Sequence, residues 1–170
     1  FQVESCTGSC HLPRPNVYRS VHDMPQADVV IVALKTTRNA LLAELLPPLL
    51  HSQTLVLLIQ NGIGLEPDVQ KMFPSLWLAA GLAFICSAKT GPGQVSHQCY
   101  GHINIGNYSC PDARIMEQLI ADFNASGRSD AATVGGTSYT IVNDHAVNGG
   151  ASFNLRFRSG TINETQLFRI

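Results

Sequence analysis

The chain has 170 residues, of which 45% are hydrophobic and 14% are charged, a composition typical of a globular domain with a sizeable core. A net charge of −1 without a lysine and arginine cluster argues against a nucleic-acid partner. No apolar stretch approaches the length of a bilayer span, so we expect no membrane partner either.

The five cysteines are odd in number and include no C-x-x-C pair. In a chain of this size that pattern argues against a disulfide scaffold and favours a reducing compartment, so we expect a cytoplasmic protein. Cys6, Cys10 and His11 have no fourth ligand at suitable spacing, and we expect no metal site. His97 and His102 are five residues apart, so on a strand they would point to opposite faces.

In chain order, residues 1–12 predict a β-hairpin. The apolar, β-branched run 28–35 predicts a strand buried on both faces, as in parallel sheets. Leucines at helical spacing predict a helix over 37–50, with prolines that bend or end it, and 54–59 is a second buried-strand pattern. Strand, helix and strand predict a βαβ unit with a right-handed crossover.

Residues 60–64 predict a turn at the carboxyl end of that second strand, and 65–73 a short helix. Residues 77–85 predict a third strand. Two short strands, 94–97 and 102–105, are expected to form an antiparallel edge on the sheet.

A final helix is predicted over 111–124, after which the periodicity weakens. We therefore divide the chain into a domain over 1–127 and a divergent tail over 128–170, in which 152–158 alternates like a strand. The expected fold class is α/β, an incomplete Rossmann-like parallel sheet with flanking helices and an antiparallel edge hairpin.

No phosphate-binding loop is found in the sequence. Gly62-x-Gly64 follows a strand, but Pro67 stands where G-x-G-x-x-G needs its third glycine, and no P-loop or G-x-S-x-G elbow occurs. If the sheet is of the Rossmann type, its first strand, glycine turn and first helix would precede Phe1. We therefore expect the sequence to be a fragment.

Three polar side chains follow predicted strands on the edge where ligands of open α/β sheets bind: Lys35, Asn61 and Ser87. Each also has an ordinary explanation. A lysine at a strand end can simply reach solvent, Asn-Gly is common turn chemistry, and a lone serine is weak evidence. The residue types alone leave these alternatives open.

Three segments, in this order and spacing, resemble the ketopantoate reductase (2-dehydropantoate 2-reductase) family. They are ADVVIVALKTT (27–37), LLIQNGIG (57–64) and the stretch 81–106, which contains GQVSH and INIG. The strand ending in Lys35, followed by the strand ending in Gln-Asn-Gly, is the most specific part. The resemblance extends over about residues 1–127.

The resemblance implies a partial NADP-binding Rossmann-like domain in an enzyme of pantothenate biosynthesis. Such an enzyme uses NADPH to reduce 2-dehydropantoate to (R)-pantoate. It implies cofactor-binding roles for Lys35, Asn61 and Ser87, with Asn61 also binding substrate. A small-molecule 2-keto acid is the implied partner, and a homodimer is compatible with the family.

The tail departs from the family pattern. The family's catalytic acid is a lysine on a helix of its second domain, whereas the lysines here are Lys35, Lys71 and Lys89. We therefore assign no catalytic residue and expect no activity from this chain alone. Two alternatives stay open: a non-catalytic remnant or interaction module with a Rossmann-like sheet, and a Rossmann dehydrogenase for another 2-keto acid.

Overall fold

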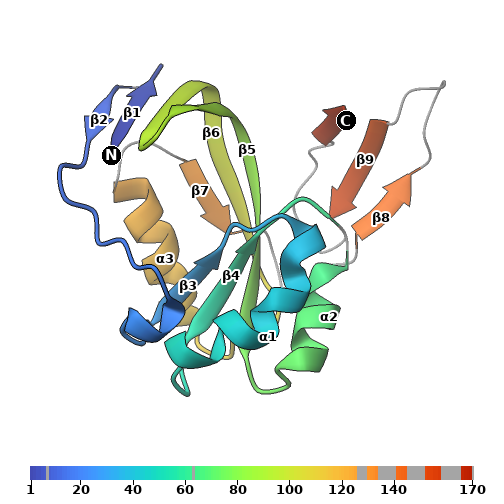
Figure 1. Ribbon diagram of the computed structural model, residues 1–170. Helices are drawn as coiled ribbons and strands as arrows, with labels where there is room; N and C mark the ends of the chain where they lie inside the picture. The colour runs from blue at the N-terminus through green and yellow to red at the C-terminus, as the bar shows by residue number, and fades with distance from the viewer. Residues whose placement is uncertain are drawn as a thin grey trace.

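The computed structural model describes residues 1–6, 8–62 and 64–125, and beyond them four strands. The larger sheet contains β1 (Gln2–Ser5), β2 (Cys10–His11), β3 (Val29–Val32), β4 (Leu55–Ile59), β5 (Trp77–Gly91), β6 (Gln94–Asn107) and β7 (Asp130–Thr133). Their order is β2-β1-β6-β5-β4-β3, and β7 also pairs with β6. The sheet curls, so that the β1–β2 hairpin and β3 lie at its two ends (Figure 1); we call the concave side of the sheet between them the trough.

The remaining strands, β8 (Ile141–Asp144), β9 (Ser152–Phe157) and β10 (Gln166–Arg169), form a separate antiparallel sheet in the order β10-β9-β8. The strand predicted over 152–158 is therefore confirmed as β9.

The predicted βαβ unit is confirmed, because β3 and β4 pair in parallel with Val29 opposite Leu55. The segment between them is helical but broken into η2 (Thr36–Leu41), α1 (Leu42–Leu45) and η3 (Pro47–Leu49). The prediction of a helical segment over 37–50 is therefore correct, but the prediction of one continuous helix is wrong. Proline lacks an N–H and its ring clashes with the preceding turn, so the α-helix ends where the prolines begin.

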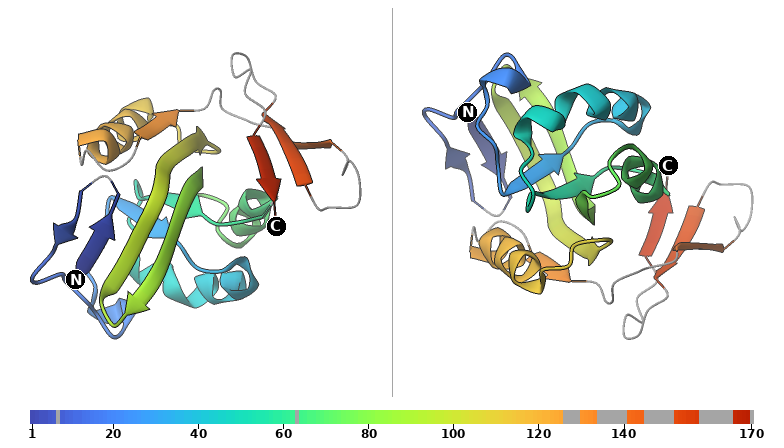
Figure 2. Two further views of the ribbon diagram at one scale, coloured as in Figure 1. Left: turned by 90° about the horizontal axis from the view of Figure 1, so that it is seen from above. Right: turned by 90° about the horizontal axis from the view of Figure 1, so that it is seen from below.

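Strand β4 is the centre of the core. Val56 and Leu58 contact one buried cluster, which includes residues of α1 and of α2 (Leu65–Met72), while Leu55 and Leu57 contact a second cluster with residues of α3 (Ala113–Ala125). Figure 2 shows α3 on one side of the β5–β6 ribbon and α1 and α2 on the other. A strand covered on both faces can be apolar throughout, and this accounts for the unbroken run of β4.

Strand β3 differs from the expectation of burial on both faces. Within the described residues it is the last strand of the sheet, and of its four residues only Val32 is buried, whereas Ile31 is 49% exposed. Its sequence resembles that of β4, but it has a strand neighbour on one side only. An apolar run thus identified the strand and not its place in the sheet.

The antiparallel part of the sheet is more continuous than predicted. The two short strands expected over 94–97 and 102–105 are a single strand, β6, which pairs along its length with β5. Gly101 does not end the strand, because Tyr100 (φ 68°) and Gly101 (φ 133°) form an irregularity within it. Nor is β6 an edge, since β1 pairs with it in parallel; the edge hairpin is β1–β2, as predicted over 1–12.

The helix predicted over 111–124 is confirmed as α3, whose residues Met116 and Leu119 are buried. Within the described part of the chain, no helix combines the length and the apolar character needed to cross a membrane.

Replacing Leu57 by alanine should reduce the free energy of unfolding by about 2–5 kcal/mol, because the side chain is fully buried and a cavity would remain. Ile31→Ala is a matched control, since Ile31 lies directly opposite Leu57 on the exposed edge strand. We expect the control to cost roughly 1 kcal/mol or less. Urea unfolding followed by circular dichroism measures both, and equal losses would contradict this description of the core.

Candidate functional site

The carboxyl ends of β3 and β4 meet at one edge of the sheet. Val32 pairs with Leu58 in parallel register, and Lys35 and Asn61 each lie three residues beyond these partners (35 − 32 and 61 − 58). A cationic residue and an amide therefore follow the same ends of two neighbouring parallel strands, in the loops just beyond them. The predicted arrangement on two parallel neighbours is confirmed, while the binding roles of both residues stay predictions.

A pair of amides joins the two loops that carry these residues. The Gln60 Nε2 group donates to the Leu34 carbonyl oxygen (2.7 Å) and to Asn39 Oδ1 (2.7 Å), and Asn39 Nδ2 donates back to Gln60 Oε1 (3.2 Å). Lys35 follows Leu34, and its own carbonyl oxygen accepts from the Arg38 N–H (2.8 Å). The loop after β3 is thus held against the loop after β4 by hydrogen bonds made immediately beside Lys35 and Asn61.

The roles of Gln60 and Asn39 were not predicted from the sequence. Two amide residues, Gln60 and Asn61, stand in succession at the strand end, and this pattern could have indicated Gln60, because its long side chain can reach a neighbouring backbone carbonyl. The partner Asn39 lies 21 residues away, and no local pattern pointed to it.

The turn after Asn61 depends on two glycines. Gly62 has φ +152°, and a Cβ there would approach Leu65 Cδ1 within 3.2 Å. Gly64 has φ +75° with open space around it, so its conformation rather than crowding favours glycine. The turn lets α2 begin immediately after the rim and directs the chain away from it, leaving the Asn61 side chain exposed.

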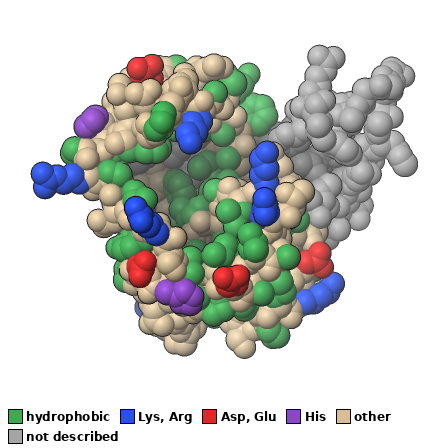
Figure 3. All heavy atoms as spheres, in the orientation of Figure 1, with side chains coloured by type: hydrophobic (Ala, Val, Ile, Leu, Met, Phe, Trp, Pro, Cys, Tyr) green, Lys and Arg blue, Asp and Glu red, His purple; other side chains and the backbone are tan. Residues whose placement is uncertain are grey.

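Both Lys35 and Asn61 are available to a ligand. Their side chains are exposed, and within the described residues neither has a side-chain hydrogen bond or ion pair. An ammonium group can neutralise a phosphate or carboxylate, and an amide can donate to and accept from a carboxamide or a keto oxygen. The face in Figure 3 is hollowed, with hydrophobic side chains inside and Lys or Arg side chains at several points of its margin.

Ser87 is placed differently from the expectation. Strand β5 continues to Gly91, so Ser87 lies within it, opposite His97, and not in a loop that follows it. Ile59 pairs with Gly81 on the neighbouring strand. Counted from this pair, Asn61 is two residues further along the chain after β4, whereas Ser87 is six residues further along β5. The difference of four residues corresponds to roughly 13 Å along extended strands.

Ser87 instead lines a cavity of about 220 Å³ in the trough, together with Ser5, Ile85 and His97. His97 is 8% exposed and is held there by its ring nitrogens: Nδ1 is 2.8 Å from Ser5 Oγ, and Nε2 is 3.1 Å from the Cys99 carbonyl oxygen. The trough floor therefore has a positioned serine–histidine pair, and the predicted contact of Ser87 with a cofactor remains a prediction.

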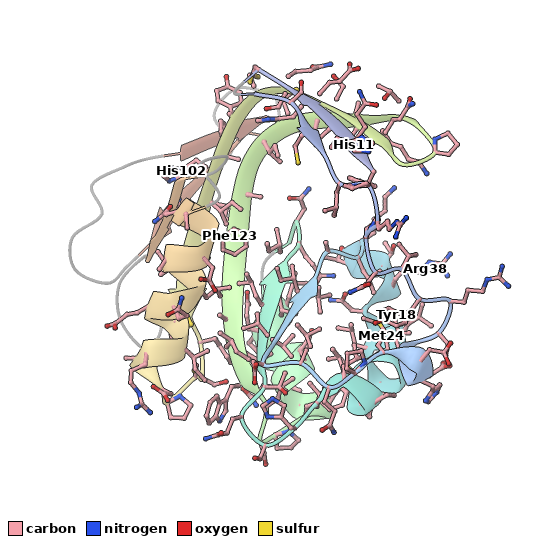
Figure 4. The ribbon with its side chains drawn as sticks, turned by 90° about the vertical axis from the view of Figure 1, so that its left-hand side faces the viewer. His11, Tyr18, Met24, Arg38, His102 and Phe123 are labelled. Carbon is pink, nitrogen blue, oxygen red and sulfur yellow. The ribbon has the colours of Figure 1, made fainter. Side chains whose placement is uncertain are left out.

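The two histidines considered for metal binding have separate surroundings. His102 Nε2 lies 2.7 Å from Asn104 Oδ1; both residues alternate with Ile103, which lines the same cavity as His97, so they lie on the opposite face of the strand. In the view of Figure 4, His102 appears on the other side of the β5–β6 ribbon from His11. Across the residues that the structure describes, no group of three His, Cys, Asp or Glu side chains is arranged to hold an ion.

Comparison with known proteins gives a consistent result. The family model described as "Ketopantoate reductase PanE/ApbA" matches residues 1–109. A 2-dehydropantoate 2-reductase from Nostoc sp. is 42% identical over 132 residues, which are 75% of this chain and 41% of that protein. One from Halobacterium salinarum is 29% identical over 134 residues, covering 78% of this chain and 44% of that protein.

Among solved structures, a 2-dehydropantoate 2-reductase from Geobacter metallireducens superimposes with a TM-score of 0.71 at 34% identity, over 78% of this chain and 44% of that one. The enzyme of the same name from Methylococcus capsulatus gives a TM-score of 0.66 at 30% identity, over 76% and 43%. The chain thus spans less than half the length of these relatives. With a family match over well more than half of its own residues, this chain belongs to the ketopantoate reductase PanE/ApbA family.

Proposed function

We propose that this chain forms the nicotinamide side of the active-site crevice in a 2-dehydropantoate 2-reductase, an enzyme that reduces a 2-keto acid with NADPH. The observation that supports this most is that Lys35 and Asn61 follow the carboxyl ends of the parallel neighbours β3 and β4. An exposed cation and an exposed amide at the carboxyl edge of an open α/β sheet occupy the position where such folds bind ligands.

A nicotinamide nucleotide is the cofactor class of this family. The described residues fit one end of such a molecule: the Asn61 amide offers both a donor and an acceptor, as a carboxamide requires. They do not fit the pyrophosphate, because Gly62-x-Gly64 continues to Pro67 and lacks the third glycine of the dinucleotide turn. Under this proposal, the phosphates are held by residues outside this sequence.

When bound, the cofactor supplies the hydride for the keto carbon. The contribution of this chain is orientation and charge. Asn61 donates a hydrogen bond toward the crevice, where negative charge develops on a keto oxygen, and Lys35 lowers the cost of gathering a carboxylate and phosphates nearby. Gln60 acts as a positioning residue, because it holds the loop of Lys35 against the strand end of Asn61.

The preference for NADPH over NADH, the contact of Ser87 with the cofactor, a cytoplasmic location and a homodimer are parts of the same proposal. A ketopantoate reductase from Staphylococcus aureus with a similar fold is described as dimeric. All five cysteines lie within the described residues and are free thiols, which suits a reducing compartment. The two alternatives, a remnant without cofactor and a reductase of another 2-keto acid, have no comparable support.

Replacing Asn61 by alanine should weaken binding of reduced nicotinamide mononucleotide about tenfold, because one hydrogen bond to the ring carboxamide is lost. The mononucleotide is the appropriate probe, since it needs no dinucleotide turn. The measurement is a titration of nicotinamide fluorescence with the purified chain. Gln53→Ala is the matched control, because Gln53 is an exposed amide just before the amino end of β4 and should leave affinity unchanged.

Affinity that is the same in the Asn61→Ala variant and in the wild type would remove Asn61 from the site. Failure of the wild-type chain to bind either the mononucleotide or NADPH would favour the non-catalytic alternative. A parallel titration with NADPH and NADH tests the preference between the two cofactors.

Gln60→Ala should lower the free energy of unfolding by about 1 kcal/mol, because the Leu34 carbonyl and the Asn39 amide both lose a half-buried partner. Amide hydrogen exchange should become faster in the loop of residues 34–39, and Gln53→Ala should change neither quantity. If exchange in this loop were the same in both variants, the amide pair would not be what holds the two loops together.

A further inference from the structure

The β5–β6 hairpin brings two thiols into register. Cys86 and Cys99 are direct Cα partners across the antiparallel pair. Residues opposite each other in such a pair have Cα atoms about 4.5 or 5.5 Å apart, depending on which of the two pair types they form. Both distances lie in the range of roughly 4.4–6.8 Å that disulfides require. The backbone therefore already holds the two cysteines at bridging separation.

The local irregularity of the hairpin makes small adjustments easier. On β6 the partners of Ile85, Cys86 and Ser87 are Tyr100, Cys99 and His97, with register shifts on both sides of the cysteine pair. One extra residue, Gly101 or Gln98, therefore lies on each side of it. Bulges interrupt the hydrogen-bond ladder between the strands and increase their local twist. The cysteine pair therefore lies in a short segment that is flanked on both sides by irregular pairing.

The two cysteines differ in access to solvent. Cys86 is exposed and its Sγ donates to Gln98 Oε1 (3.3 Å), while Cys99 is half-buried. Burial raises the pKa of the Cys99 thiol, and the adjacent Cys86, through its charge and a hydrogen bond, raises that pKa further. The exposed Cys86 is thus the thiol that a reagent in solution meets first, with Cys99 beside it as the second partner.

The other cysteines are less suited to bridging. Cys6 follows β1 and its N–H donates to the His97 carbonyl oxygen (3.1 Å), so it is near Cys99 without facing it across a strand pair. Cys10 pairs with Val3 on the β1–β2 hairpin, and Cys110 is buried in the core cluster that α3 covers. Only the Cys86–Cys99 pair combines direct opposition with an exposed member.

We propose that Cys86 and Cys99 form a redox modification site that closes to a reversible cross-strand disulfide on reaction with a low-molecular-weight disulfide such as oxidised glutathione. The Cys86 thiolate attacks one sulfur of the reagent and releases one thiol, leaving a mixed disulfide. Cys99 then attacks Cys86 Sγ and releases the second thiol. The two cysteines lose two protons and two electrons, and the reagent takes up both to become two thiols.

The bond would connect the two strands immediately beside Ser87 and His97, which line the trough. It would therefore fix the bulged part of the hairpin in the oxidised state. In a reducing compartment the pair stays open, and only a rise in oxidised thiols closes it.

The test is to treat the full chain with oxidised glutathione and count free thiols before and after. We expect Cys86 and Cys99 both to be lost as free thiols without retaining glutathione, because one disulfide consumes two of the five thiols, whereas the exposed Cys6 can only add glutathione as a mixed disulfide. Trypsin and chymotrypsin together cut after Phe84, Lys89 and Tyr100, so mass spectrometry should find peptide 85–89 linked to peptide 90–100. Reduction with dithiothreitol should separate them.

Cys86→Ser and Cys99→Ser should each abolish the linked peptide, whereas Cys10→Ser should leave it unchanged. Circular dichroism of each variant before oxidation shows whether it is folded. The proposal is overturned if glutathione remains attached to Cys86 and Cys99 without a bond between them, or if the major link joins Cys6 to Cys99. It is also overturned if all five thiols survive treatment that oxidises a control dithiol peptide.

Discussion

The parallel pairing of β3 with β4 determines where the loops of Lys35 and Asn61 leave the sheet. It sets Val32 opposite Leu58, so the loops that carry Lys35 and Asn61 leave the sheet at the same edge. The pairing is stable because β4 is buried on both faces, between clusters contributed by α1 and α2 on one side and α3 on the other. Burial of β4 in this way anchors the sheet edge from which both loops extend, even though β3 itself is half exposed.

The side chains at the rim can be exposed because other residues hold their backbone. The Gln60–Asn39 amide pair and the Leu34 carbonyl join the two loops, and the turn at Gly62 and Gly64 directs the chain away at once. Lys35 and Asn61 are therefore not needed for local structure, and both are free to contact a ligand. Supporting residues that are separate from the residues proposed to bind are what a preorganised site requires.

Much of this arrangement could be predicted from sequence. The apolar runs identified β3 and β4, and their order with a helical segment between them implied a parallel pair, which gave the shared edge and its two polar residues. Three features could not be read locally. The exposure of β3 depends on its place in the sheet, the continuity of β6 through Gly101 depends on pairing with β5, and the Gln60–Asn39 contact spans 21 residues. The displacement of Ser87 from the rim follows from the second of these, because pairing with β6 extends β5 to Gly91.

We propose that reduced nicotinamide binds beside Lys35 and Asn61. The most direct test is an NMR titration of the isotope-labelled chain with NADPH, following every backbone and side-chain amide. We predict the largest shift changes at the Asn61 side-chain amide and at the backbone amides of Lys35 and Gly62. Changes confined to the opposite, amino end of β4, around His51 and Trp77, would show that NADPH does not bind at this edge of the sheet.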